Sequence, residues 1–279
     1  MTQPASSTPT ISRYGVKTQV SSVTPVDYAV EQLKLRGYAA VDGGYSADEI
    51  AAFKAAFDEA RTASEARHGG RPALAAIDEH NTVRIAMSYH PIFLGLAMNP
   101  TVVEVCKRLI GDYIVLNQQN GIVNPGNLER YNQGSYHRDL PFQHFTSSRP
   151  LAINALYCVD DFTLENGATF VVPASHKEEP FPSDTMIQAS QVQVAAPAGS
   201  FIVLDCMVFH SGGVNRTSKE RRGVNHVYSI PLIKQQIDLP RALGDAFTAD
   251  AEARKLLGYG LSIPDSVESY YQSRKPSAR

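Results

Sequence analysis

The chain has 279 residues, of which 43% are apolar and 19% charged, a composition typical of a globular protein with one or two domains. A formal net charge of −2 argues against a broad basic surface, so no nucleic-acid partner is expected. No apolar run approaches the roughly 20 residues of a membrane span, so no membrane partner is expected either.

The cysteines and the first residues bear on the cellular compartment. Cys106, Cys158 and Cys206 are odd in number and far apart, which indicates free thiols rather than disulfides or a zinc site. The N-terminus carries neither the basic region nor the apolar stretch of a signal peptide. Together these features predict a cytoplasmic protein, and they leave the number of subunits open.

The N-terminal part of the chain is predicted to be mainly helical. Residues 1–22 are rich in Ser, Thr and Pro and are expected to form a flexible arm, followed by a single domain over 23–279. Ser46 and Glu49 form a capping box, which is typical of a helix start. Apolar residues at helical spacing, with Gly or Pro beside them, place the other elements. The expected elements are helices over 26–35, 46–66 and 100–111 and a strand over 38–41.

After Gly111 the pattern changes to short β-type segments separated by Pro, Gly and Asn. The expected strands are 113–124, 151–159, 168–173, 199–209 and 222–230. Helical signal returns only near 240–257. Helices first and strands afterwards predict the α+β class, with an antiparallel sandwich or barrel over about 113–232 and the N-terminal helices packed on it.

His137 and Asp139 are the first candidate metal ligands. Side chains two residues apart on a β-strand project to the same face, so an imidazole nitrogen and a carboxylate oxygen would converge. Two ligands hold a redox metal poorly, and His210 is the candidate for a third. Two His and one carboxylate with open positions form the facial triad of non-haem Fe(II) oxygenases. Each residue alone also has an ordinary structural explanation, so the hypothesis depends on the three together.

Arg221 is a candidate anion-binding residue. It stands eleven residues after His210 and leads into the last predicted strand. A guanidinium at the floor of a barrel suits bidentate binding of a carboxylate. The adjacent Arg222 would point to the opposite face, so only one of the two can enter a pocket. On its own, an Arg at the start of a strand is more often a surface residue.

The order of these residues resembles the phytanoyl-CoA dioxygenase family, which includes the ectoine and proline hydroxylases. Each motif is loose, whereas their order and spacing together are specific and extend from Gly37 to Tyr228. The family's usual Pro-Gly-Ser-His turn is Pro-Ala-Ser-His here. The resemblance implies a double-stranded β-helix, a jelly-roll or cupin-like barrel, with Fe(II)- and 2-oxoglutarate-dependent oxygenase chemistry. The motifs are His137-x-Asp139, Asn166-Gly167-Ala168, Val172-Pro173-Ala174-Ser175-His176, Gly199-Ser200-Phe201, His210 with Gly213 and Asn215, and Arg221.

The resemblance also implies roles for single residues. The triad would bind Fe(II) and leave positions for 2-oxoglutarate and O2, and Arg221 would pair with the far carboxylate of 2-oxoglutarate. If the register of the strand 113–124 were shifted by one residue, a neighbouring amide would face the cosubstrate in place of Gln118. Related halogenating enzymes lack the carboxylate of the triad, so Asp139 favours oxygenation over halogenation. The amides expected beside the cosubstrate or the substrate are Gln118, Asn154 and Asn225.

The implied activity is hydroxylation of a small molecule, or desaturation, epoxidation or ring closure, with release of succinate and CO2. The segment 80–95 and the loop after Asp139 are expected to line the substrate pocket, through Arg84, Phe142 and Gln143. This mix of side chains favours a polar molecule with an anionic group. An amino acid derivative and an intermediate of secondary metabolism both fit that description.

Two other functions stay open at this point. The first is a barrel protein that binds a metal or 2-oxoglutarate without turnover, against which the intact triad argues. The second is a cupin-like hydrolase or isomerase that uses its metal as a Lewis acid. Activity without O2 and 2-oxoglutarate would support the second function.

Overall fold

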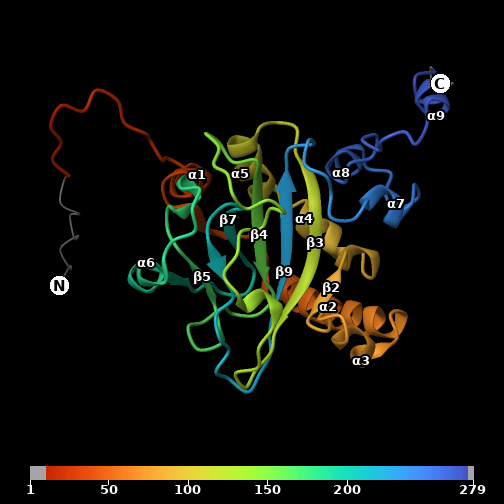
Figure 1. Cartoon of the computed structure of the whole chain (residues 1–279), viewed down its shortest axis with the longest axis horizontal. Helices are drawn as coiled ribbons and strands as arrows, with labels where there is room; N and C mark the ends of the chain where they lie inside the picture. Colours follow the sequence, from red (N-terminus) through yellow and green to blue (C-terminus); the bar gives the residue numbers. More distant parts are fainter. Residues whose placement is uncertain (1–10, 276–279) are drawn as a thin grey trace, which may run out of the picture.

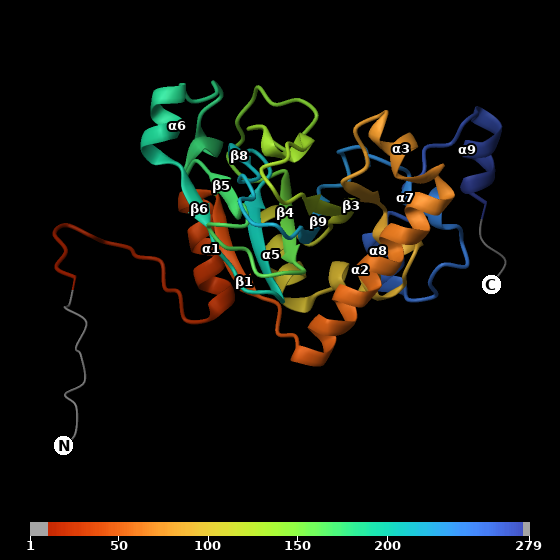
Figure 2. The same cartoon turned by 90° about the horizontal axis from the view of Figure 1, so that it is seen from below.

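The computed structural model describes residues 11–275, which form three layers. A six-stranded sheet lies in the middle, with helices on one face and a three-stranded sheet on the other (Figure 1, Figure 2). All strand pairs are antiparallel, and the predicted α+β class is confirmed. Residues 11–23 are exposed and form neither helix nor strand. Residues 1–10 of the predicted arm and residues 276–279 lie outside the described residues.

The large sheet separates two apolar layers. Phe201 and Val203 pack toward the helices, whereas Ile202 and Leu204 pack toward the small sheet. This alternation is the period of two that a strand imposes on its side chains. In spatial order the strands are β1 (Tyr38–Asp42), β7 (Ser200–Asp205), β4 (Ala152–Cys158), β9 (Arg221–Ser229), β3 (Val115–Asn124) and β2 (Thr82–Arg84).

The small sheet covers part of the inner face of the large sheet. Val171 and Val194 from the small sheet share one buried cluster with Ile202 and Leu204. This packing holds the short strand β8 opposite the polar side chains of β4 and β9. The strands of the small sheet are β6 (Val192–Val194), β5 (Thr169–Val171) and β8 (His210–Ser211).

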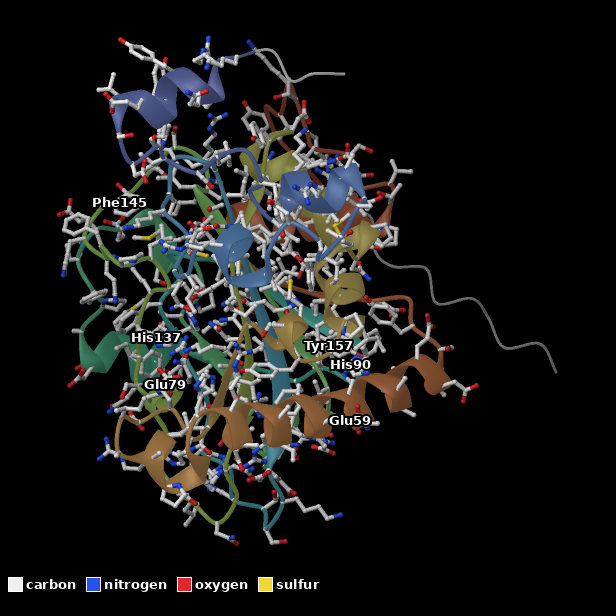
Figure 3. All side chains as sticks on the ribbon, turned by 90° about the vertical axis from the view of Figure 1, so that its right-hand side faces the viewer. Glu59, Glu79, His90, His137, Phe145 and Tyr157 are labelled. Carbon is white, nitrogen blue, oxygen red and sulfur yellow. The ribbon has the colours of Figure 1, made fainter. Side chains whose placement is uncertain are left out.

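Three N-terminal helices cover the outer face, and their starts are fixed by local sequence. Both α1 (Pro25–Arg36) and α2 (Ala47–Arg67) begin with a complete capping box, and Asn99 caps α5 (Pro100–Ile110). The ring of Phe53 on α2 lies 5.3 Å from that of Tyr157 on β4. Farther along α2, Glu59 approaches His90 at 3.8 Å (Figure 3). The predicted helices at 26–35, 46–66 and 100–111 are confirmed.

The remaining elements are short. No described helix combines the length and the apolar composition needed to cross a membrane. All three cysteines are buried and free, as predicted. The short elements are α3 (Gly70–Ala75), η1 (Ala86–Ser88), α4 (Ile92–Ala97), η2 (Asn132–Gly134), η3 (Ser175–Lys177), α6 (Asp184–Ser190), α7 (Leu239–Leu243), α8 (Ala251–Leu256) and α9 (Val267–Ser273).

Two sequence predictions need correction. The strand expected over 199–209 ends at Asp205, because the Asp205 carboxylate accepts a hydrogen bond from the Met207 amide and closes a turn. The chain then enters the small sheet as β8, so His210 begins a separate strand and does not directly follow the preceding one. The helical segment expected near 240–257 is two short helices, because Gly244 ends α7 in the left-handed region (φ +78°).

The buried His226 makes the stability of the fold depend on pH. Its Nδ1 lies 3.1 Å from the Ala155 carbonyl, and its Nε2 lies 3.0 Å from the Gln119 amide nitrogen. A neutral ring satisfies both contacts, because Nδ1–H donates to the carbonyl and Nε2 accepts from the amide. Burial lowers the pKa of His226 to about 4. The unfolded chain therefore binds a proton at higher pH than the folded chain does. This difference contributes stability above pH ~6.5 that is lost as the pH falls toward ~4.

We expect the free energy of unfolding to fall by up to about 3 kcal/mol from His226 alone between pH ~6.5 and ~4. Denaturant unfolding at several pH values measures this slope. His226→Gln should flatten the slope without abolishing it, because burial also lowers the pKa of His176 to about 4. An unchanged slope in His226→Gln would contradict this explanation.

Candidate metal centre

Three predicted ligands meet at one point between the two sheets. One potential ligand atom from each of His137, Asp139 and His210 lies within 4.8 Å of the others. The Asp139 Oδ1 atom is 3.7 Å from His137 Nε2 and 3.6 Å from His210 Nε2. The two imidazole rings lie 4.5 Å apart between centroids. Two imidazoles and one carboxylate converging in this way form the donor set of a facial triad.

Backbone pairing brings the three residues together across 73 positions of sequence. His137 and His210 exchange both backbone hydrogen bonds, at 2.9 and 3.1 Å, and so form an isolated antiparallel bridge. The Asp139 amide donates to the Cys206 carbonyl at 2.9 Å. The turn after Asp205 is therefore what places Cys206 and His210 beside the His-x-Asp segment. Arg138 points away and donates to four backbone carbonyls, which fixes the neighbouring loops.

Each histidine presents its Nε2 atom to this point because its Nδ1 atom is already engaged. The Nδ1 atom of His137 lies 2.8 Å from the Ser135 carbonyl, and that of His210 lies 2.9 Å from the Val208 carbonyl. A carbonyl can only accept, so each Nδ1 carries the hydrogen and each Nε2 has a free lone pair. Both rings are thus held in the tautomer that ligates a metal.

The carboxylate of Asp139 is held ionised in a buried position. Burial opposes its ionisation, but His210, His137 and a hydrogen bond from Asn154 together lower its pKa to about 2. The Asn154 amide donates to Asp139 Oδ2 at 2.8 Å. This bond leaves Oδ1 directed at the two imidazoles. Asn154 therefore orients the carboxylate, a role that the sequence did not predict for it.

Arg221 lines the same cavity, and no acidic partner for it is found among the described residues. Its side chain is 3% exposed. The guanidinium lies 3.8 Å from the Phe162 ring centroid and 3.4 Å from the Tyr131 hydroxyl, and its Nε atom has no partner. A buried cation without a counter-ion is costly, so this position calls for an anion. Arg222 points to the other face and pairs with Asp160, as alternation predicts.

The triad cavity, as we name the space in front of the triad, has a free volume of about 40 Å³. Its wall includes the predicted Asn154 and Asn225, whose Oδ1 atoms are buried without a partner. Tyr131 lines this space and contacts Arg221, and it was not predicted from the sequence. No local pattern marks Tyr131, because it lies 90 residues from Arg221 in an irregular segment after β3. The remaining lining residues are Ile122, Gln133, Leu156, Thr169, Leu204 and Gly212.

Four other predicted residues lie outside the wall of this cavity. Gln118 shares a face of β3 with Asn120, as expected. Their partners on β9, Val227 and Asn225, lie on the face of the large sheet that lines the triad cavity. Phe142 is exposed, and Gln143 accepts a hydrogen bond from the Arg138 amide. Arg84 lines a different and larger cavity. The structure therefore gathers the three triad residues, Arg221 and two of the three predicted amides, and leaves these four apart.

The sequence profile of the phytanoyl-CoA dioxygenase (PhyH) family matches residues 33–223, well over half of the chain. The chain belongs to the phytanoyl-CoA dioxygenase family. The matched segment contains the whole triad and Arg221. The family assignment made from the sequence is thereby confirmed. The predictions of an oxidoreductase that uses Fe(II), 2-oxoglutarate and O2 are confirmed at the level of this family.

Two relatives align with most of the chain. An uncharacterised protein of Mycobacterium tuberculosis, Rv1501, is 31% identical over 92% of this chain and 95% of its own length. The dioxygenase af480 of Aspergillus fumigatus is 27% identical, with 79% of this chain and 74% of the relative covered.

Solved structures share the fold at lower identity. EctD from S. alaskensis, with 2-oxoglutarate and 5-hydroxyectoine, has a TM-score of 0.62 at 20% identity and covers 79% of this chain and 82% of its own. The epimerase SnoN, in complex with Fe3+, alpha ketoglutarate and nogalamycin RO, has a TM-score of 0.56 at 22% identity and covers 74% and 84%. At these identities the likeness shows the fold alone.

Proposed function

We propose that this chain hydroxylates a small organic molecule in a reaction that requires Fe(II), 2-oxoglutarate and O2 and that releases succinate and CO2. One oxygen atom of O2 enters the substrate C–H bond and the other enters succinate, so the equation balances. The observation that carries the proposal is the pairing of a converged His-Asp-His set with a buried, unpaired guanidinium in one cavity. We also propose that the two sheets form the double-stranded β-helix expected from the sequence.

The residues of the cavity fit an iron ion and a dicarboxylate. His137, Asp139 and His210 would hold the metal, and Arg221 would pair with the far carboxylate of 2-oxoglutarate. The iron, when bound, supplies the oxidising chemistry. The protein supplies ligand orientation through Asn154 and the two backbone carbonyls, and it excludes water with the apolar side chains of β3, β4 and β7. The unpartnered Oδ1 atoms of Asn154 and Asn225 are available to hydrogen-bond donors in the cavity.

The cosubstrate needs more room than the triad cavity offers. A water molecule occupies about 10–15 Å³ on this measure, so about 40 Å³ holds only a few waters. The hydroxyl of Tyr131 fills the space beside Arg221. Because Tyr131 belongs to an irregular segment rather than a strand, its side chain can turn aside without breaking a strand pair. We therefore propose that 2-oxoglutarate replaces Tyr131 as the neighbour of Arg221.

Of the two substrate classes that fit the sequence, we propose an intermediate of secondary metabolism. An amino acid derivative would bring its own carboxylate to the reaction centre. Arg221 is the one Arg or Lys among the described residues that line the triad cavity, and the cosubstrate would occupy it. A substrate with neutral groups near the reacting carbon fits better.

Succinate release from 2-oxoglutarate, measured with Fe(II), ascorbate and O2, tests the proposed function. We expect slow turnover without substrate, and complete loss when a chelator removes the metal or when O2 is excluded. Restoring Fe(II) should restore turnover. Activity on a substrate panel without O2 and 2-oxoglutarate would instead support a hydrolase or isomerase.

Asn154→Ala is expected to weaken metal binding by about 10–100-fold, the range for partners that orient metal ligands. The cause is the lost hydrogen bond that directs Asp139 Oδ1 toward the two imidazoles. Equilibrium dialysis against Fe(II) or Co(II) measures this change. Asn225→Ala is the matched control, because Asn225 lines the same cavity but makes no bond to Asp139, and its metal affinity should stay that of the wild type.

A further inference from the structure

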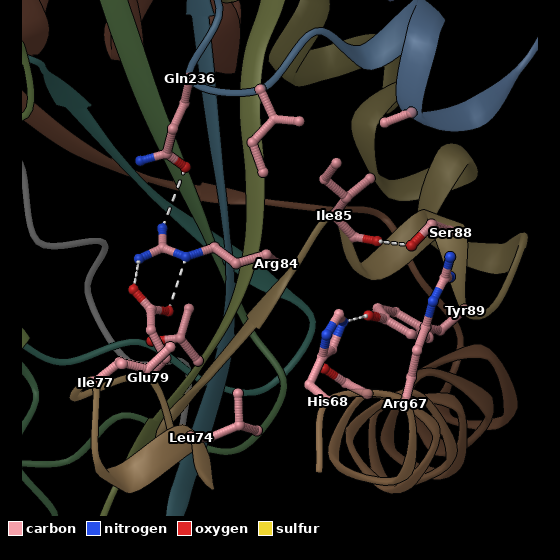
Figure 4. Close-up of a pocket in the computed structure, with 14 residues that line it drawn as sticks. Arg67, His68, Leu74, Ile77, Glu79, Arg84, Ile85, Ser88, Tyr89 and Gln236 are labelled. Atoms are coloured by element: carbon pink, nitrogen blue, oxygen red, sulfur yellow. Dashed lines mark hydrogen bonds and ion pairs between the residues drawn. The ribbon is translucent and has the colours of Figure 1, made fainter. Parts of the chain in front are cut away.

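A second, larger cavity lies beside the edge strand β2, and we name it the edge chamber. It has a volume of about 590 Å³ and lies between the end of α2, α3, η1 and the segment leading into α7 (Figure 4). Its volume is within the range of small-molecule sites, about 300–1,000 Å³. Its apolar wall includes Leu74, Ile77, Ile85 and Ile237. The half-buried Arg84 and the exposed Gln236 line the end nearest β3, which we call the inner end.

Arg84 in the edge chamber and Asn225 in the triad cavity lie on one face of the large sheet. Arg84 on β2 pairs with Asn120 on β3, and Asn120 pairs with Asn225 on β9. Arg84 lines the edge chamber, whereas Asn225 lines the triad cavity. Neighbouring strands are about 4.8 Å apart, so the chamber begins only about 10 Å from β9. One row of side chains therefore leads from one space to the other.

Polar side chains form the partition between the two spaces. The Nη1 atom of Arg84 lies 3.1 Å from the Gln236 Oε1 atom, and Gln236 lies 3.2 Å from the Asn120 side chain. Glu79 accepts from the Nε atom of Arg84 at 2.9 Å and neutralises its charge (Figure 4). Gln236 is exposed and comes from an irregular segment after β9, and its backbone amide donates to the Asn117 carbonyl of β3 at 3.2 Å. Opening the partition requires the side chains of Gln236 and of the buried Asn120 to turn aside, and neither movement breaks a strand pair.

We propose that the edge chamber holds the body of the substrate, a mostly apolar molecule of about three or four fused rings with neutral oxygen groups at its inner end. This inference rests on the proposed function. The reacting end would pass Gln236 and reach the triad cavity, which is too small to hold such a body itself.

Size and charge set this substrate class. An apolar cavity of about 150 Å³ accepts one benzene molecule, and the edge chamber has roughly four times that volume. Because Glu79 already pairs with Arg84, the inner end offers hydrogen bonds rather than a net charge. Arg67 lies exposed at the rim, where water solvates its charge. Arg84, which the sequence suggested for an anionic group, therefore suits a carbonyl or hydroxyl oxygen.

The backbone at Ile85 gives independent support for a shaped wall. Ile85 has φ +50° and ψ 62°, a left-handed conformation that is rare and costly for a β-branched residue. Hydrogen bonds from Ile85 and Met87 to Gln119, at 2.8 and 2.9 Å, hold this conformation. It ends β2 after three residues and turns the Ile85 side chain into the edge chamber. Such strain is typical of ligand-binding segments.

The chamber is tested with N-phenyl-1-naphthylamine, a neutral three-ring amine that fluoresces in apolar surroundings. We expect saturable binding of one equivalent to the metal-free protein. Ala242→Trp on α7 and Ser88→Trp on η1 should each raise the Kd of this probe at least tenfold. Ala251→Trp places the same side chain on α8, outside the chamber, and should leave the Kd unchanged. Equal Kd values in all four proteins would overturn the proposal.

Tryptophan fluorescence checks that the two chamber variants, Ala242→Trp and Ser88→Trp, are folded and that their indole rings lie in the chamber. The natural chain contains no tryptophan, so each introduced indole is the sole tryptophan fluorophore. Its emission should shift to shorter wavelength in Ala242→Trp and Ser88→Trp, where it enters the apolar space, and stay that of exposed indole in Ala251→Trp. A solvent-exposed emission in both chamber variants, combined with a raised Kd, would also count against the proposal.

A second measurement separates this inference from the proposed function. Co(II) absorbs visible light and quenches a nearby fluorophore, whereas Zn(II) has a filled d shell and does not. We expect Co(II), but not Zn(II), to quench the bound probe, and His137→Ala to abolish that quenching without changing probe binding. Probe binding without quenching in protein that holds Co(II) would refute a substrate site here while leaving the oxygenase proposal intact. Quenching without succinate release would refute the oxygenase proposal alone.

Discussion

His137→Ala is expected to lose Fe(II) and all measurable succinate formation while it stays folded. Removal of a residue that only orients a metal ligand costs about 10–100-fold in affinity, so loss of a ligand should cost more than about 100-fold. The His137 side chain is a quarter exposed, so its truncation leaves only a small defect in packing. Metal content after dialysis, the succinate assay and the unfolding midpoint measure the three parts of this expectation.

His144→Ala is the matched control for this variant. His144 belongs to the loop after Asp139 but is exposed and stands outside the converged ligand set. We expect wild-type metal content and turnover from it. If His137→Ala retained its iron, or if His144→Ala lost it, the assignment of the ligands would be wrong.

The sequence predicted elements whose signals are local. A capping box at Ser46 and Glu49 needs only neighbouring residues, and α2 begins there as expected. The convergence of the His137 and Asp139 side chains likewise requires only that the local backbone be extended. His210 was identified correctly as the third member of the cluster, but the strand that carries it was not. The turn at Asp205 depends on one side-chain hydrogen bond that apolar periodicity does not reveal.

Features that depend on pairing between residues far apart in the chain could not be predicted from the sequence. β2 has three residues, too few for any periodicity, and it exists because it pairs with β3. The edge chamber follows from that pairing and from Gln236, which approaches Arg84 across 152 residues. For the same reason the sequence could name Arg84 as a pocket residue but could not show that Glu79 neutralises its charge. The charge expected of the substrate changes with that contact.

Arg221→Gln is expected to raise the KM for 2-oxoglutarate by at least about 30-fold, with a smaller effect on kcat. Truncating one partner of a buried, hydrogen-bonded charge pair costs about 2–5 kcal/mol, and 2 kcal/mol corresponds to about 30-fold. A neutral amide can hydrogen-bond a carboxylate but cannot balance its charge. Arg221→Lys should give an intermediate KM, because it keeps the charge and loses the planar fork. Succinate formation at varied 2-oxoglutarate concentration measures these values.

Arg222→Gln separates the binding of the cosubstrate from the general effect of losing an arginine on β9. Arg222 faces the helices, where it pairs with Asp160 and Asp58 at 2.9 and 2.7 Å. Its replacement should lower the free energy of unfolding by about 1.5–3 kcal/mol, the range for hydrogen bonds to charged groups, and leave the KM unchanged. Arg221→Gln should show the opposite pattern, because its guanidinium is buried without a carboxylate and is costly in the free protein. A raised KM in both variants would mean that neither arginine binds 2-oxoglutarate directly.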